Sequence, residues 1–391
     1  MKYDPNKNSI LLAVSLAVFT DAFLYCLALP LLPAYSKQYR LNQIDLDILI
    51  GSYAVALLLG TYPLGRLVDK IGRRAVLLWG LLSLFSTTFI FAFATSYLLL
   101  VLARILQGLS ATITWTAGMA FIADYFNKDA RGRAMGIAVA FANLGVLIGL
   151  PVSGWLYQHY SPRAPFFAAA ILVLVDALSR TMLLRDKASN STLNIKIGLR
   201  ELIKNIDILV FSGSIVIGSG LLALLDATLP TYLDSTIKMT TTTIGLYLSV
   251  AAATNMVVSV FIGAIAVKFG RKSVLTFGLL LTAICVPLPI FAKSTIGIAS
   301  YMALIGVANT LVLSSANPAV ADIVESMNSN SYGSVFSISN ISHAIGIMAG
   351  PILGSTMLHT MGIKGTLALT WIILILYILA VNKAATATSL T

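Results

Sequence analysis

Long apolar stretches recur along the whole chain, and their length leaves few folds open to it. The first covers residues 10–33 and is interrupted by a single carboxylate, Asp21. As an α-helix rising about 1.5 Å per residue, it would span roughly 35 Å, which is enough to cross a bilayer core of about 30 Å. Charged residues make up only 10% of the chain, against about 25% in average soluble proteins. The sequence therefore predicts an all-α protein that crosses a membrane many times.

Twelve stretches have the length and hydropathy of membrane helices. The longest polar stretch between them, at about residues 185–207, leaves six on each side. We therefore predict an N-terminal six-helix half at residues 1–185, a cytoplasmic linker at 186–207 and a C-terminal six-helix half at 208–391. The expected helices cover residues 10–33, 46–68, 74–94, 97–124, 134–157, 164–184, 208–233, 243–267, 273–292, 295–322, 333–358 and 365–382.

Basic side chains indicate the orientation of these helices. They gather in alternate loops, for example at residues 66–74, 128–133 and 268–272. This is the positive-inside pattern, which places those loops and both termini in the cytoplasm. The pattern also accounts for the net charge of +11 without a nucleic-acid partner. The two cysteines, Cys26 and Cys285, lie in apolar stretches, so we expect neither a disulfide framework nor a metal site.

Three short motifs occur twice in the chain, and the shift between the two copies is nearly the same for all three. One shift shared by three motifs indicates two homologous halves in parallel orientation. Transporters built from such repeats place their substrate between the halves, near the middle of the membrane, and rock the halves about it. The paired motifs are residues 32–35 with 229–232, 65–74 with 263–272, and 149–154 with 350–354.

The repeated motifs supply candidate gating residues. Glycines permit a tight turn and close helix approach, Asp69 can cap or pair with a neighbouring helix end, and Arg73 can bridge to another cytoplasmic group. If this loop served only to orient the helices in the membrane, that would explain its basic residues. It would not explain why both copies share the same glycine spacing. In the fifth and eleventh helices, small residues allow close packing and prolines bend the helix. The predicted gating and packing residues are Gly65, Asp69, Gly72, Arg73, Gly149, Pro151, Gly350 and Pro351.

Of the ionisable side chains inside predicted membrane helices, where charge is costly and usually functional, we select three as candidates. Asp21 would lie near the midplane, as a functional carboxylate or as a buried structural one. Arg104 could tune a nearby carboxylate, bond backbone carbonyls or serve packing alone. Asp226 lies four residues before Pro230, whereas Asp21 lies twelve before Pro33. Asp226 should therefore lie about 12 Å nearer the outer face, in a proton or cation path or at a helix end in contact with water.

Uncharged polar side chains complete the candidate set for substrate or proton contacts. Each could line a cavity, and each has interhelical hydrogen bonding as its alternative explanation. The residues in this group are Tyr25, Tyr53, Asn143, Asn317 and Asn340.

Taken together, these motifs resemble those of the major facilitator superfamily. The likeness covers essentially the whole chain and includes the 65–74 loop, Arg104-Ile-Leu-Gln107-Gly108 and the helix with Gly149, Pro151 and Gly154. Within that family the sequence is similar to the drug:proton antiporters, and specifically to the vesicular amine transporters. The segments that carry this closer likeness are residues 21–22, 29–35, 92–97, 103–108, 131–138, 145–151, 164–166, 172–176, 226–230 and 332–336.

The resemblance implies an exchange of cytoplasmic amines or lipophilic cations for protons, with no cofactor beyond the proton. The acid of the first helix falls on Asp21, which would hold the amine. The acid of the seventh falls on Asp226, where the amine transporters have Glu. A family Lys aligns with Tyr53 and a family acid with Asn340, which leaves the substrate and coupling stoichiometry open. The short connection between the first two helices suggests a bacterial member, and hence the inner membrane.

We therefore expect a proton-coupled antiporter that exports small amines, lipophilic cations or drugs by alternating access, as a monomer in the lipid bilayer. The alternative is an importer or uniporter of a nutrient or of a metal-chelating metabolite such as a siderophore. A receptor or scaffold without transport is a third hypothesis, but it gains nothing from the cost of intramembrane charge. We do not expect an enzyme, because the polar segments show no nucleophile–base pair, phosphate loop or metal cluster.

Overall fold

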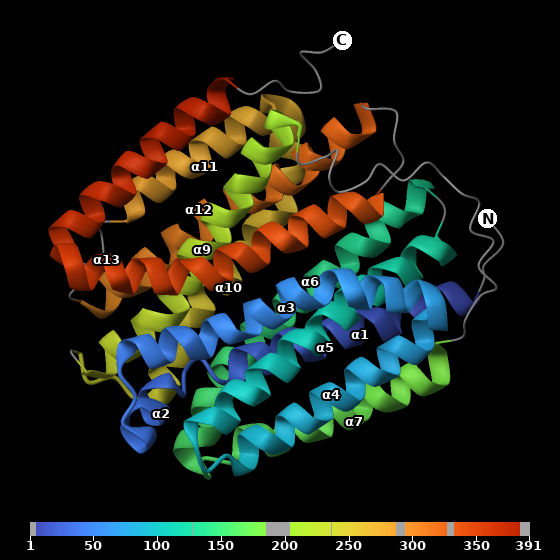
Figure 1. Ribbon diagram of the computed structural model, residues 1–391, viewed down its shortest axis with the longest axis horizontal. Coiled ribbons are helices and arrows are strands. Elements are labelled where there is room, and N and C mark those ends of the chain that lie inside the picture. The colour runs from blue at the N-terminus through green and yellow to red at the C-terminus, as the bar shows by residue number, and fades with distance from the viewer. Residues whose placement is uncertain are drawn as a thin grey trace. The chain divides into compact units, whose positions relative to one another are not determined.

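The structure is a computed structural model that describes residues 5–126, 128–184, 204–235, 237–286, 294–326 and 332–383. Every regular element in these ranges is an α-helix (Figure 1). The helices are α1 (Pro5–Leu27), α2 (Leu32–Tyr39), α3 (Gln43–Ile71), α4 (Arg73–Phe93), α5 (Tyr97–Tyr125), α6 (Lys128–His159), α7 (Ala164–Leu183), α9 (Ile206–Ser235), α10 (Thr241–Phe269), α11 (Arg271–Cys285), α12 (Thr295–Ser326) and α13 (Tyr332–Lys383).

Ten of the described helices are long and apolar enough to cross a membrane. The other two predicted spans fall on α11, which is described over 15 residues, and on the first part of α13. The 52 residues of α13 are interrupted at Gly362, whose φ of 66° is not helical. This break lies between the two spans predicted at 333–358 and 365–382.

The predicted helix over residues 10–33 is wrong at its C-terminal end. Helix α1 ends at Leu27, and α2 begins at Leu32 with Pro33 in its first turn. Proline lacks a backbone N–H and fits best in the first turn of a helix, so the closely spaced Pro30 and Pro33 favour a break followed by a new start. The next helix, α3, begins at a capping box in which Asn42 and Asp45 each bond the other's backbone N–H.

The described residues form two compact units. The first contains those within 1–190 and 227–249, and the second contains those within 191–226 and 250–391. Thus α9 and α10 each contribute to both units. The domain boundary that we place in the 186–207 linker remains a prediction, since residues 185–203 lie outside the described ranges.

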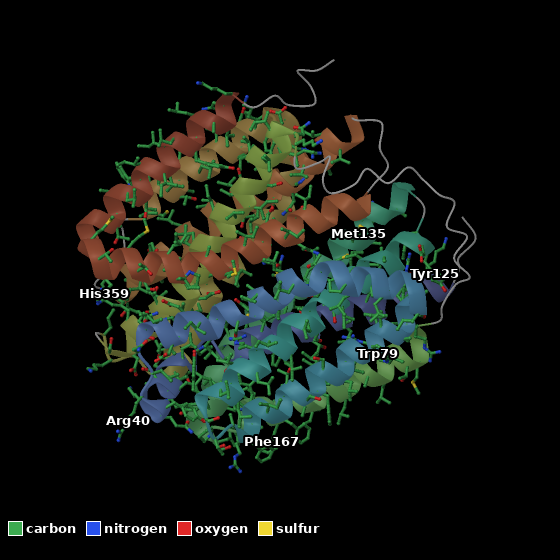
Figure 2. The ribbon with its side chains drawn as sticks, viewed as in Figure 1. Arg40, Trp79, Tyr125, Met135, Phe167 and His359 are labelled. Atoms are coloured by element: carbon green, nitrogen blue, oxygen red, sulfur yellow. The ribbon has the colours of Figure 1, made fainter. Side chains whose placement is uncertain are left out.

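In the first unit, α1 packs against α5, α6 and α7, and α4 runs beside α5 and α7 (Figure 1). Two glycines of α6 set the closest approach: a Cβ on Gly149 would lie 2.9 Å from the carbonyl oxygen of Phe23, and one on Gly145 would clash with Phe19 of α1. Apolar side chains such as Trp79 on α4 and Phe167 on α7 are exposed (Figure 2). Such side chains are expected where a helix faces lipid.

The second unit repeats this arrangement. Gly346 and Gly350 of α13 face the backbone of Val216 and Gly220 in α9, as Gly145 and Gly149 face α1. The core is formed by α9, α11, α12 and α13, and its buried members are Ile208, Phe211, Ile215, Leu275, Leu279, Val312, Ala316, Ala319, Val320, Ile323, Val324, Ile338, Leu374, Ile378 and Val381. The internal repeat of the sequence is therefore a repeat of helix contacts.

Candidate functional site: a buried charge cluster in the first unit

Asp21 lies on the inward face of α1 and is only 2% exposed. The side chain of Trp115, on α5, forms a hydrogen bond to its carboxylate, while Oδ1 has no hydrogen-bond partner among the described residues. The neighbouring Thr20 hydroxyl donates to the carbonyl of Leu16 within α1. Asp21 is thus held in the protein interior with one oxygen available to a cation or a proton.

Tyr25 lies one helical turn further along α1 than Asp21. It belongs to a second cluster of side chains, which also contains Tyr53 and Arg104. The rings of Tyr25 and Tyr53 lie 4.8 Å apart, centroid to centroid. Tyr53, on α3, is within electrostatic range of both Asp21 and Arg104. Residues four apart share a helix face, so Asp21 and Tyr25 point into the same region between α1, α3 and α5.

Arg104 is completely buried on α5, and part of its guanidinium has no partner. Nη1 donates to the carbonyl of Tyr25 at 3.2 Å and to Oε1 of Gln107 at 2.9 Å. The guanidinium carbon lies 5.2 Å from the Tyr25 ring centroid and 5.8 Å from that of Phe91. Nε and Nη2 of Arg104 and Nε2 of Gln107 have no hydrogen-bond partner in the described structure. The cluster therefore presents N–H donors beside the aromatic rings.

Sequence reasoning missed a fully buried ion pair on α7. Arg180 donates from Nε to Oδ1 of Asp176 at 2.9 Å and from Nη2 to Oδ2 at 2.6 Å. Its Nη1 also donates to the carbonyl of Leu77, on α4, at 3.0 Å. Both side chains are 0% exposed. The signal available in the sequence was an acid and a base four residues apart inside an apolar stretch.

The remaining predicted substrate and proton residues are dispersed. Asn143 is partly buried in α6, and Asp226 and Asn340 are partly buried in α9 and α13. Asn317, on α12, is exposed and donates its amide to the carbonyl of Leu313 in its own helix, at 3.1 Å. Asp226 belongs to the second unit and Asp21 to the first, so their predicted difference in depth remains a prediction.

The motif around Arg73, for which we predict a cytoplasmic location, forms a defined contact. Gly72 has a φ of 92° and separates α3 from α4. Arg73 then forms an ion pair with Asp124, near the end of α5, and bonds the carbonyl of Ala120. The side chains at positions 65 and 69 lie outside the described ones, so the roles predicted for Gly65 and Asp69 remain predictions.

The same contact occurs in the second unit. Gly270, with a φ of 83°, separates α10 from α11, and Arg271 forms an ion pair with Asp322 of α12 at 2.7 Å. Arg271 lies as many residues after Arg73 as Asp322 lies after Asp124. The second ion pair is therefore the repeat of the first. Of the other predicted gating residues, Pro151 lies inside α6 and Pro351 inside α13, each just after a glycine of the helix contact.

At the opposite end of the first unit, α2 meets the last part of α9. Lys37 and Asp234 form an ion pair at 2.6 Å. The two side chains line an open cavity of about 440 Å³ together with Pro33, Ala34, Gln38, Tyr157, Thr241 and Ile244. Because Lys37 is 70% exposed, this pair is screened by solvent and contributes little to stability.

Comparison with known proteins identifies the family. The sequence pattern of the Major Facilitator Superfamily matches this chain over residues 14–235 and again over residues 209–387. The chain belongs to the Major Facilitator Superfamily. It is therefore an integral, multi-pass membrane protein of a transporter family and not an enzyme, and the predicted all-helical membrane fold is confirmed.

Named relatives of this superfamily member include vesicular transporters. The human chromaffin granule amine transporter is 30% identical over 334 residues, which cover 84% of this chain and 63% of that protein. The probable vesicular acetylcholine transporter-B of Danio rerio is 31% identical over 387 residues, covering 91% of this chain and 75% of the relative. The chain thus spans somewhat less than two thirds of the human protein's length.

A solved structure supports the fold of this superfamily member. The crystal structure of a bacterial homologue of the human lysosomal transporter Spinster matches it with a TM-score of 0.81, over 98% of both chains. Their sequences are only 16% identical, so this likeness concerns the fold alone.

Proposed function

We propose that this protein is a proton-coupled antiporter that exports small amines, lipophilic cations or drugs by alternating access. The observation that carries the proposal is Asp21, a carboxylate in a membrane helix, 2% exposed, with an oxygen that lacks a partner among the described residues. The related amine and acetylcholine transporters are named for cationic substrates. We further propose a monomer in a bacterial inner membrane, with both termini cytoplasmic.

In this mechanism Asp21 alternates between a cation and a proton. The ionised carboxylate binds the ammonium group of the substrate, and the rings of Tyr25 and Tyr53 favour a cation beside them. Protonation removes the negative charge and releases the substrate. Asp226 carries or gates a proton, and Arg104 adjusts the local field. The paired ion contacts Arg73–Asp124 and Arg271–Asp322 stabilise helix ends that must rearrange as access alternates.

The test is transport by purified protein in liposomes. We expect Asp21→Asn to reduce amine-driven proton movement to the background of empty liposomes, because the amide can neither release a proton nor pair with a cation. Asp21→Glu keeps the charge and is the matched control, which should retain measurable coupling. Full coupling in Asp21→Asn, with any of the tested amines or lipophilic cations, contradicts the proposed role.

The buried donors of Arg104 and Gln107 favour a second candidate. Donors without partners suit a carboxylate or carbonyl on the substrate, as found on many nutrients and metal-chelating metabolites such as siderophores. An importer or uniporter of such a compound would raise its accumulation under an inward proton gradient, whereas the exporter lowers it. A receptor or scaffold would show no counterflow of any solute.

A further inference from the structure

Arg104 and Arg180 are both completely buried in the first unit, but their guanidinium groups are bonded differently. Arg180 uses every guanidinium nitrogen. Its Nε and Nη2 donate to the two carboxylate oxygens of Asp176, at 2.9 and 2.6 Å, and its Nη1 donates to the carbonyl of Leu77, at 3.0 Å. Nε and Nη2 lie on one edge of the planar guanidinium, and this edge matches the two oxygens of a carboxylate.

The same edge of Arg104 has no such partner. Its Nη1 also donates to a backbone carbonyl, that of Tyr25 at 3.2 Å, whereas its Nε and Nη2 have no hydrogen-bond partner among the described residues. No described carboxylate forms an ion pair with Arg104 either. A guanidinium stays protonated in proteins, and a buried charge without a partner is strongly unfavourable. The bonding of Arg104 is therefore that of Arg180 without the carboxylate.

The end of α1 explains the bond between Arg104 and the backbone. In a continuous α-helix the N–H of Leu29 would bond the carbonyl of Tyr25. Helix α1 ends at Leu27, and the N–H of Leu29 bonds the carbonyl of Cys26 instead. The last carbonyls of a helix need partners and favour a positive charge beside them. Nη1 of Arg104 thus caps α1, a task in which its Nε–Nη2 edge takes no part.

The groups around Arg104 favour a ligand with an apolar body. The guanidinium carbon lies 5.2 Å from the ring centroid of Tyr25 and 5.8 Å from that of Phe91. Gln107 accepts from Nη1 at 2.9 Å, and its Nε2 is a further buried donor without a partner in the described structure. Tyr25 is partly exposed, whereas Phe91, Arg104 and Gln107 are buried. A few buried donors among aromatic rings are typical of a site for a small organic molecule.

We propose that the Nε–Nη2 edge of Arg104 binds the carboxylate of a small aromatic or otherwise lipophilic monocarboxylate. Each carboxylate oxygen accepts from one nitrogen, as in the Asp176–Arg180 pair, and Gln107 supplies an additional donor. A second carboxylate on the same molecule would be buried without a partner. The proposal goes beyond amine exchange and narrows the acceptor of the second candidate function to a carboxylate. It concerns binding and does not depend on the role of Asp21.

The repeated fold does not require an arginine at this position. Met302 lies as many residues after Arg104 as Arg271 lies after Arg73. Met302 is 1% exposed, so the corresponding position of the second unit buries an apolar side chain. The change Arg104→Met therefore introduces a side chain that the same arrangement of helices already accommodates.

Equilibrium dialysis of radiolabelled benzoate against the full chain in lipid nanodiscs tests the proposal, with empty nanodiscs as the background. We expect saturable binding by the parent protein. Benzamide has nearly the same shape but is uncharged, and chloride is charged but lacks a pair of oxygens. Each should compete about tenfold or more weakly than unlabelled benzoate, because neither forms two charge-assisted hydrogen bonds with the guanidinium.

Three variants locate the site. Arg104→Met should reduce benzoate binding to the background. Arg104→Lys keeps the charge but not the paired donors, and should weaken binding about tenfold. Arg163→Met is the matched control. The guanidinium of Arg163 also lies over a ring, with its carbon 5.0 Å from the centroid of Phe93, but this side chain is exposed. Its loss should leave benzoate binding unchanged.

If Arg104→Met does not fold, Gln107→Glu retains Arg104 and adds a competing carboxylate one turn away, and it must remove benzoate binding. The proposal is overturned if the parent shows no saturable binding, if Arg104→Met binds as well as the parent, or if benzamide or chloride competes as well as benzoate. Specific benzoate binding by a protein without amine-driven proton movement would refute the proposed amine exchange and leave this site in place.

Discussion

The two units of this protein share their helix contacts and differ in what they bury at the centre. A Cβ added at Gly80 would lie 2.7 Å from Ile113, and one added at Gly278 would lie 2.7 Å from Leu311. Gly108 approaches the carbonyl of Tyr53 as Gly306 approaches that of Ala251. These contacts and the ion pairs Arg73–Asp124 and Arg271–Asp322 all recur at one and the same interval along the chain. Close approach and helix-end pairing are therefore common to both units.

The centres of the two units are chemically unlike. At the same interval along the chain, Arg104 and Gln107 of the first unit correspond to Met302 and Ile305, both 1% exposed. The glycine contacts that match Phe19 and Phe23 of α1 with Val216 and Gly220 of α9 place Gly218 at the position of Asp21, and Gly218 faces Leu313. The same arrangement of helices can thus bury either apolar or charged side chains at these positions. Its charged version, in the first unit, is where we expect the chemistry of transport.

Placing a charge in the second unit should have the largest effect on stability. Met302→Arg copies Arg104 into a site without its partners, and a charged side chain within the membrane costs about 3 kcal/mol. We expect a loss of that size in SDS-induced unfolding of the purified protein. The reverse change, Arg104→Met, should stay within about 1 kcal/mol of the parent while transport is lost. Equal stability of Met302→Arg and the parent would contradict the distinction between the centres.

Filling the shared helix contacts should affect both units alike, and less strongly. Gly149→Leu and Gly350→Leu place side chains against the backbone of α1 and α9, and overpacking of this kind costs about 1–3 kcal/mol. Gly136→Leu is the control, because a Cβ there meets nothing within 4 Å. The same unfolding assay measures all three. A clear loss in only one unit would show that the repeated contacts are not energetically equivalent.

Neutralising the helix-end ion pairs Arg73–Asp124 and Arg271–Asp322 should have the smallest effect on stability. The side chains of Asp124 and Asp322 are 32% and 39% exposed, so Asp124→Asn and Asp322→Asn should each lose less than about 1 kcal/mol. The losses should shrink further in high salt, which screens exposed charges. Transport rates of the two variants measure gating separately. If the pairs act as equivalent latches, both rates change in the same direction.

The sequence by itself determined the helical membrane architecture, the duplication and the burial of Asp21. These features follow from local composition and spacing: apolar stretches of membrane length, motifs repeated at one shift, and an acid that lipid would not tolerate. The Arg73 motif was also recognisable, because glycine and basic residues recur together. Its partner Asp124 was not, since it lies far along the chain on another helix.

Only the tertiary structure decided how the charged side chains are combined. It brings Trp115 to Asp21, leaves donors of Arg104 beside Tyr25 without partners among the described residues, and joins Asp176 and Arg180 in a buried ion pair. It also ends α1 at Leu27. Hydropathy and periodicity describe each helix alone, whereas the cost of a buried charge depends on neighbours supplied by other helices. The packing of α1 against α5 and α7 therefore fixed what the sequence left open.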